Sequence, residues 1–181
     1  MPWSLAVCLV FFNWPTSTPL LQGSNLPVEE RMDLWAAYRL ASIHKTDTAS
    51  LANFERAASD CCAGQPENNV AAGFFATAKL MQVESMTNLV EKLESFLQWK
   101  SELERSIALH PTDADLRLFR LSVQLHVPML LAYSSDIEKD ATFIWTALET
   151  GFWASDSLHE TFIREIYTAF ELPQSTLINE K

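Results

Sequence analysis

The sequence of 181 residues contains only four glycines, at positions 23, 64, 73 and 151. So few glycines leave little material for the many tight turns that an all-β sandwich or barrel requires. No run of residues shows the sustained alternation of apolar and polar side chains that marks a half-buried strand. Together these two absences favour an all-α fold.

Cysteine is also scarce. Cys8 lies in the apolar amino-terminal segment, and Cys61 and Cys62 are adjacent in the sequence. Neighbouring cysteines rarely bridge each other and no second pair exists, so neither a disulfide framework nor a CxxC metal knuckle can be built. The histidines, His44, His110, His126 and His159, share no metal-ligand spacing. The sequence therefore predicts no metal and no cofactor.

The familiar catalytic motifs are missing as well. The chain has no phosphate-binding loop, no dinucleotide-binding glycine pattern and no G-x-S-x-G elbow. The segment HETFI at His159 lacks the second histidine of a zinc-protease helix. These absences favour a protein that is not an enzyme.

Positive charge is sparse, because 23 acidic side chains outnumber 13 basic ones and give a formal net charge of −10. Such a surface repels phosphate backbones, and no cluster of lysines and arginines offsets it locally. Anionic membrane surfaces are disfavoured for the same reason. We therefore expect no nucleic-acid partner.

The first 28 residues contain no Asp, Glu, Lys or Arg side chain. Within them, Pro2 to Trp14 is nearly continuously apolar but too short to span a bilayer comfortably. The segment suits the apolar region of a signal peptide, although no basic residues precede it. We expect residues 1–26 to be a signal peptide or apolar leader and the protein to be exported, to the periplasm. The alternatives are a buried arm on a cytoplasmic protein and an uncleaved anchor, which would be the protein's one membrane contact.

What the sequence does contain is helical periodicity over residues 27–173, where it predicts about seven helices. The first helix begins after Pro27, Asp47 or Thr48 caps the second, and Thr87 or Asn88 caps the fourth. The fourth helix carries apolar residues at helical spacing: Leu89, Leu93, Phe96, Leu103 and Ile107. Because the connections are short, we expect antiparallel helical hairpins. Residues 174–181 are expected to fray.

Three further helix starts are predicted from capping patterns. Thr112 with Asp115 is the pattern for the fifth helix, which ends before Pro128. Ser135 with Glu138 and Ser157 with Glu160 are the patterns for the sixth and seventh helices. Gly151 is a natural residue to follow the end of the sixth helix, and Pro173 stops the seventh.

Two arginines and a glutamine, Arg117, Arg120 and Gln124, form one stripe on the fifth helix. The other residues of this helix are apolar nearly all round, which predicts burial. Buried arginines need partners, and Asp140 on the inward stripe of the next helix is the best carboxylate. The cluster is interpreted either as an internal ion pair or as a pocket for an anionic ligand, with Tyr133 and Asp136 at its mouth. Catalysis there lacks a nucleophile–base pair.

The aromatic stretch from Trp145 to Trp153, WTALETGFW, contains a helix-ending glycine. Tryptophan and phenylalanine most often pack in the core. An exposed pair of Phe152 and Trp153, with Trp145 nearby, would instead suit a protein-partner surface.

The segment Trp99 to Pro111 resembles the closing half of a tetratricopeptide repeat, on Leu103, Ser106 and Pro111. A wider resemblance covers about Val70 to Leu148 and is to a bacterial family of tetratricopeptide-like proteins, many of them exported. The residues that carry it are Leu116, Arg117, Arg120, Val123, Gln124, Pro128, Tyr133 and Asp140. The resemblance implies a helical-hairpin fold and no assigned chemistry.

The sequence thus predicts a non-enzymatic helical-hairpin module that binds a protein partner. Two alternatives stay open, namely an anionic-ligand or enzymatic pocket around Arg117, Arg120 and Asp140, and a structural component of the cell envelope.

Overall fold

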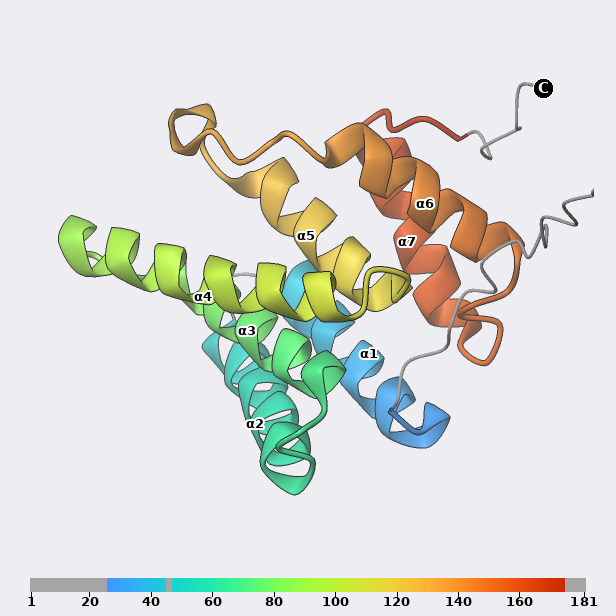
Figure 1. Ribbon diagram of the computed structural model, residues 1–181, viewed down its shortest axis with the longest axis horizontal. Coiled ribbons are helices and arrows are strands. Elements are labelled where there is room, and N and C mark those ends of the chain that lie inside the picture. The colour runs from blue at the N-terminus through green and yellow to red at the C-terminus, as the bar shows by residue number, and fades with distance from the viewer. Residues whose placement is uncertain (1–25, 45–46, 175–181) are drawn as a thin grey trace, which may run out of the picture.

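The computed structural model describes residues 26–44 and 47–174, apart from the side chain of Leu130 (Figure 1). The predictions for the amino-terminal leader and for the carboxyl-terminal tail therefore fall outside the described residues, except for Leu26 and Gln174. None of the described helices combines the length and the apolar character that crossing a membrane requires.

The described residues form seven α-helices and one short 3-10 turn, and they contain no strand, so the predicted all-α class is confirmed. The elements in chain order are α1 (Val28–Ile43), α2 (Thr48–Gly64), α3 (Asn69–Val83), α4 (Leu89–Leu109), α5 (Ala114–His126), η1 (Met129–Leu131), α6 (Ile137–Glu149) and α7 (Ser157–Ala169).

Four of the helices begin behind an Asp or Asn whose side chain accepts hydrogen bonds from two backbone N–H groups of the first turn. These residues are Asp47, Asn68, Asn88 and Asp113. A short polar side chain at this position satisfies donors that have no partner within the helix. The predicted start after Pro27 is confirmed, and of the alternative caps the structure has Asp47 rather than Thr48 and Asn88 rather than Thr87.

The three capping patterns predicted for the later helices are wrong in detail. Asp113 rather than Thr112 caps α5, and Asp156 rather than Ser157 caps α7. A carboxylate at the N-cap also interacts favourably with the helix dipole, which a neutral hydroxyl does not. Ser135 does not cap α6, because its hydroxyl donates to Asp136 Oδ2, and Asp136 itself precedes the helix without a side-chain cap.

The helices pack mostly against their neighbours in sequence, α1 with α2, α2 with α3, α3 with α4, and α5 with α6. In addition, α5 packs against α3 and α4, and α7 packs against α1. Figure 1 shows α1 lying between α2 and α7, so that the first and last helices are side by side. The helices therefore surround α5 rather than forming an open row.

The centre of the core lies where α3 and α5 cross. Phe74 and Phe119 meet edge to face with ring centroids 4.7 Å apart, and Tyr38 of α1 meets Phe119 at 5.0 Å. Gly73 lets the backbone of α3 approach Leu116 of α5, because a Cβ at this position would overlap Leu116 Cδ2. As predicted, α5 is buried on nearly all sides.

Only part of the apolar stripe of α4 is buried. Phe96, Leu103 and Ile107 pack in the core, whereas Leu89 is 77% exposed and Leu93 is 43% exposed. The amino-terminal half of α4 extends beyond the other helices at one edge of the molecule (Figure 1). This half of the helix therefore presents apolar side chains that no other described helix covers.

Candidate functional site

The predicted cluster on α5 is an internal ion-pair network. Arg117 Nη1 donates to Asp140 Oδ1 at 2.8 Å, and Arg120 Nε donates to Asp140 Oδ2 at 2.6 Å. Arg120 Nη2 donates to Asp140 Oδ1 at 2.8 Å and lies 3.6 Å from Asp136 Oδ1. Asp140 is fully buried. One buried carboxylate thus holds two guanidinium groups of the preceding helix.

The remaining nitrogens of both arginines are also engaged. Arg120 Nη1 donates to Glu104 Oε2 of α4 at 3.0 Å, and Arg117 Nε and Nη2 both donate to the carbonyl oxygen of Pro111. Burial opposes the charged form of Arg120, but the hydrogen bonds and charge of Asp140 outweigh it and hold the guanidinium pKa above its usual value. Each guanidinium nitrogen therefore already has an oxygen partner.

Tyr133 closes this network from the segment after η1, since its hydroxyl donates to Glu104 Oε1 at 2.5 Å. Burial and the Glu104 carboxylate raise the pKa of Tyr133 well above its usual range. Gln124 does not take part, because neither atom of its buried amide has a hydrogen-bond partner among the described residues. The structure thus brings together Arg117, Arg120, Tyr133, Asp136 and Asp140 and leaves Gln124 apart.

A second buried network, which the sequence analysis did not predict, surrounds Asp115 at the start of α5. The indole N–H groups of Trp35 and Trp153 donate to Asp115 Oδ1 at 2.9 and 2.8 Å. Arg31 Nη1 donates to Asp115 Oδ2 at 3.0 Å and Arg31 Nη2 lies 3.8 Å from Asp113 Oδ2. Burial raises the pKa of Asp115 to about 7, and the neighbouring charge of Asp113 acts in the same direction.

Most of the aromatic residues predicted to form a partner surface pack inside the protein, around this network. Trp153 is fully buried and donates to Asp115, so it offers no surface to a partner. Phe152 and Trp145 are half-buried, with Phe152 under the Arg31 guanidinium at 5.1 Å and Trp145 under that of Arg164 at 5.2 Å. The aromatic stretch is thus used to join α1, α5 and the segment before α7.

His159 of α7 lies in an aromatic box and is fully buried. Its ring stacks on Trp35 with centroids 5.1 Å apart, and the rings of Tyr38, Trp153 and Phe162 surround it. Neither ring nitrogen has a hydrogen-bond partner in the described structure. Burial lowers the pKa of His159 to about 3, with a smaller contribution from the charge of Arg39, so the imidazole is neutral at physiological pH.

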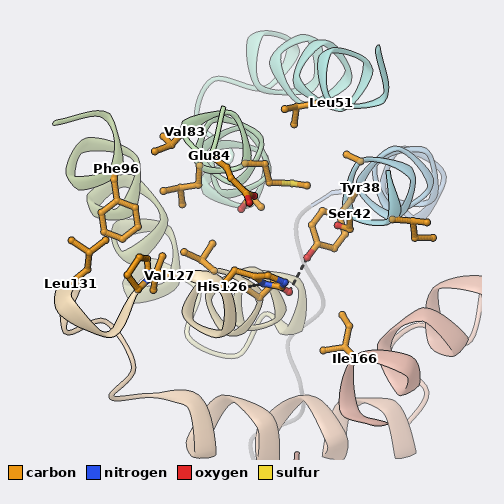
Figure 2. A pocket seen from close by; sticks show the side chains of 18 of the residues that line it. Tyr38, Ser42, Leu51, Val83, Glu84, Phe96, His126, Val127, Leu131 and Ile166 are labelled. Carbon is orange, nitrogen blue, oxygen red and sulfur yellow. Dashed lines mark hydrogen bonds between the residues drawn. The ribbon is translucent and has the colours of Figure 1, made fainter. Parts of the chain in front are cut away.

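An apolar groove with a volume of about 700 Å³ lies between α1, α3, α4, the end of α5 and α7. Figure 2 shows side chains from these helices and from Leu131 of η1 pointing into the same space. We use the name apolar groove for the cavity lined chiefly by Ile43, Leu80, Leu89, Leu93, Phe96, Val123, Val127, Leu131, Ile166 and Phe170.

The groove opens to solvent, because several of its apolar side chains are exposed. Ile43 is 60% exposed and Phe170 is 39% exposed, in addition to Leu89 and Leu93 on α4. Isolated exposed apolar residues are common on protein surfaces, but several around one cavity make that cavity a candidate binding surface.

The polar groups of the groove are mostly bonded within the protein. The Tyr38 hydroxyl donates to Ser122 Oγ at 2.9 Å, and the Thr77 hydroxyl donates to the carbonyl oxygen of Gly73. His126 Nδ1 lies 2.7 Å from the carbonyl oxygen of Ser122. These bonds link the walls of the groove and leave the hydroxyls of Tyr38 and Thr77 and Nδ1 of His126 unavailable to a ligand.

Sequence reasoning missed the groove because it depends on which residues of an apolar stripe stay uncovered. Leu89 and Leu93 share the helical spacing of Leu103 and Ile107, and only the length of α4 relative to its neighbours separates the two pairs. A signal for the Asp115 network was present, since Asp115 is a third charge on a helix that was predicted to be buried.

Comparison with protein families, curated proteins and solved structures found no match for this chain. Within residues 26–44 and 47–174, no group of His, Cys, Asp and Glu side chains is arranged to hold a metal ion.

Proposed function

We propose that this chain is a non-enzymatic protein-interaction module of tetratricopeptide-like helical hairpins, and that the apolar groove binds an apolar segment of a protein partner. The observation that carries the proposal is the set of exposed apolar side chains around one cavity of about 700 Å³. The resemblance over residues 70–148 agrees with such a module and with action after export. The all-α fold of the described residues is compatible with an interaction module and with action after export.

The two arginines of α5 are a weaker place for a ligand. An anion would have to displace Asp140, Glu104 or the carbonyl oxygen of Pro111, because these oxygens already occupy the guanidinium nitrogens. Removing a buried carboxylate from its arginines is costly. The groove, by contrast, needs no internal contact to break before it accepts an apolar side chain.

The proposal is tested by site-specific photo-cross-linking in the cells that make the protein. A cross-linking side chain at position 43 or 93 lies in the groove, whereas one at position 109 or 158 replaces an apolar residue outside it that is also exposed. We expect the same partner protein to be cross-linked from both groove positions and from neither control position. Identical products from all four positions, or none from the groove, would refute the proposal.

The affinity of the identified partner is then compared for two matched double variants. Replacing Ile43 and Leu93 by glutamine removes two apolar contacts of the groove, and replacing Leu109 and Leu158 makes the same change elsewhere. We expect at least about tenfold weaker binding for the groove variant, which corresponds to about 1.4 kcal/mol. Equal affinities for the two variants would contradict a role for the groove.

A further inference from the structure

We infer that the segment held in the apolar groove is an amphipathic α-helix whose polar flanks carry lysine or arginine. The inference rests on the proposed function and names the kind of partner segment. It follows from the lack of backbone partners in the groove and from two unpaired carboxylates on its walls.

The helical form follows from hydrogen bonding. An extended peptide satisfies its backbone by adding to the edge of a sheet, and the described residues contain no strand. The groove offers few alternatives, because the hydroxyls of Tyr38 and Thr77 and Nδ1 of His126 are bonded to other atoms of the protein. A helix satisfies its own backbone and presents only side chains to such a surface.

The charge of the flanks follows from two carboxylates that line the groove. Glu84 follows the end of α3 and Glu165 belongs to α7, and neither side chain forms an ion pair with a described residue. Lys92, the one lysine of the lining, donates to the carbonyl oxygen of Glu84 at 2.8 Å, and its formal charge offsets one of the two carboxylates, which leaves the lining with one formal negative charge. The whole chain carries a net charge of −10. Basic flanks would therefore be attracted at long range and meet carboxylates at the groove.

The test uses a fluorescent synthetic peptide about five turns long, with leucine on one helical face and lysine elsewhere. Three comparison probes isolate each property. One has glutamate in place of every lysine, one has prolines at two central polar positions to prevent a helix, and palmitate represents a small apolar ligand. Fluorescence anisotropy measures binding to the full chain at low and at high salt.

We expect the lysine peptide to bind at least about tenfold more tightly than the glutamate peptide at low salt, and the proline peptide to bind negligibly. High salt should narrow the preference for lysine, because screening weakens interactions between exposed charges. Replacing Glu84 and Glu165 by glutamine should also reduce the ratio of the affinities for the lysine and glutamate peptides. The matched control replaces Glu67 and Glu138, which are exposed and lie outside the groove, and should leave the preference unchanged.

The remaining outcomes separate the two proposals. If the glutamate or proline peptide binds as tightly as the lysine peptide, and the glutamine variant at positions 43 and 93 abolishes binding, the inference is wrong and the proposed function stands. Peptide binding that this groove variant leaves unchanged, or no peptide binding at all, overturns both proposals. Palmitate that binds in the groove while no peptide does would assign the site to a small apolar ligand and would also overturn both.

Discussion

Three buried aspartates of this protein differ in how their charge is neutralised. Asp140 is held by the two guanidinium groups of Arg117 and Arg120, whereas Asp113 and Asp115 share Arg31. A buried carboxylate with too little opposing charge shifts toward its neutral form. This difference explains why burial raises the pKa values of Asp113 and Asp115. Burial is the main cause of both shifts, and the charge of Arg31 opposes it only in part.

Removing the carboxylate of Asp140 should destabilise the protein strongly. Asp140→Ala would leave Arg117 and Arg120 charged in a poorly solvated site, and breaking a buried pair typically costs about 3–5 kcal/mol. Chemical denaturation monitored by circular dichroism gives the free energy of unfolding of the variant and of the wild type.

Glu149→Ala is the control for that measurement, because it also removes one carboxylate. Glu149 and its partner Arg164 are both 46% exposed, and the pair is 3.3 Å apart. Exposed pairs of this kind contribute little, so the variant should stay within about 0.5 kcal/mol of the wild type. Equally small effects of the two substitutions would contradict a structural role for the Asp140 network.

His159 should make the protein less stable as the pH falls below neutrality. The pKa of His159 is about 3 in the folded protein, below the usual value of about 6.5 in an unfolded chain, so unfolding takes up a proton between these values. His159→Phe keeps the aromatic box and removes this proton uptake. Between pH 7.5 and pH 5 the variant should lose about 2 kcal/mol less than the wild type.

The comparison must be made between variant and wild type at each pH, because Asp115 acts in the opposite direction. The pKa of Asp115 is about 7 in the folded protein, above that of an aspartate in an unfolded chain. The folded state therefore binds the proton more tightly, and Asp115 lowers the free energy of unfolding as the pH rises. At pH 7.5, His159→Phe should stabilise the protein by about 1 kcal/mol, since it removes two buried nitrogens without hydrogen-bond partners. His44→Gln, at an exposed histidine, provides the control. Parallel pH profiles of wild type and His159→Phe would refute this account.

At the scale of the elements, Gly73 allows a close approach between α3 and α5 in the core. Gly73→Ala would place a methyl group against Leu116 Cδ2, which is fully buried and has little room to move. Overpacking of a well-packed core typically costs about 1–3 kcal/mol. The measurement is the midpoint of thermal or chemical unfolding.

Gly64→Ala makes the same chemical change where nothing lies within 4 Å of the added Cβ. Gly64 is the last residue of α2, and alanine loses less backbone freedom than glycine on folding. The control should therefore be neutral or stabilising by up to about 1 kcal/mol. A Gly73→Ala variant as stable as Gly64→Ala would show that α3 and α5 can separate without cost.

The elements themselves were largely predictable from the sequence. The apolar spacing of each helix, Pro27 before α1, Asp47 before α2 and Gly151 after α6 are local signals, and the structure agrees with them. The predicted N-cap residues of α5, α6 and α7 each differ from the observed ones by one position. In each of these segments an aspartate stands beside the serine or threonine, and local patterns do not decide which of two neighbouring polar side chains caps the helix.

At the scale of the whole molecule, the sequence predicted a charge pairing between two consecutive helices but not one between helices that are distant in the chain. Asp140 lies 20 residues from Arg120 on the next helix, and their pairing was anticipated. Arg31 lies 84 residues from Asp115, and Trp153 approaches the same carboxylate from the other side. No periodicity within a helix indicates which distant helix will cover it. The groove escaped prediction for the same reason, because α1, α4 and α7 meet there only through the packing of the whole chain.

The contact between α1 and the start of α7 also determines when, during synthesis, the fold can be completed. Asp156, which accepts a hydrogen bond from Arg39 at 2.6 Å, follows it by 117 residues. Ribosomes add roughly 5–20 residues per second, so Asp156 is synthesised about 6–23 s after Arg39. The same helix, α7, supplies Ile166 to the groove. A nascent chain therefore cannot offer the complete groove before α7 has been synthesised, and a partner that recognises all of its walls cannot bind earlier.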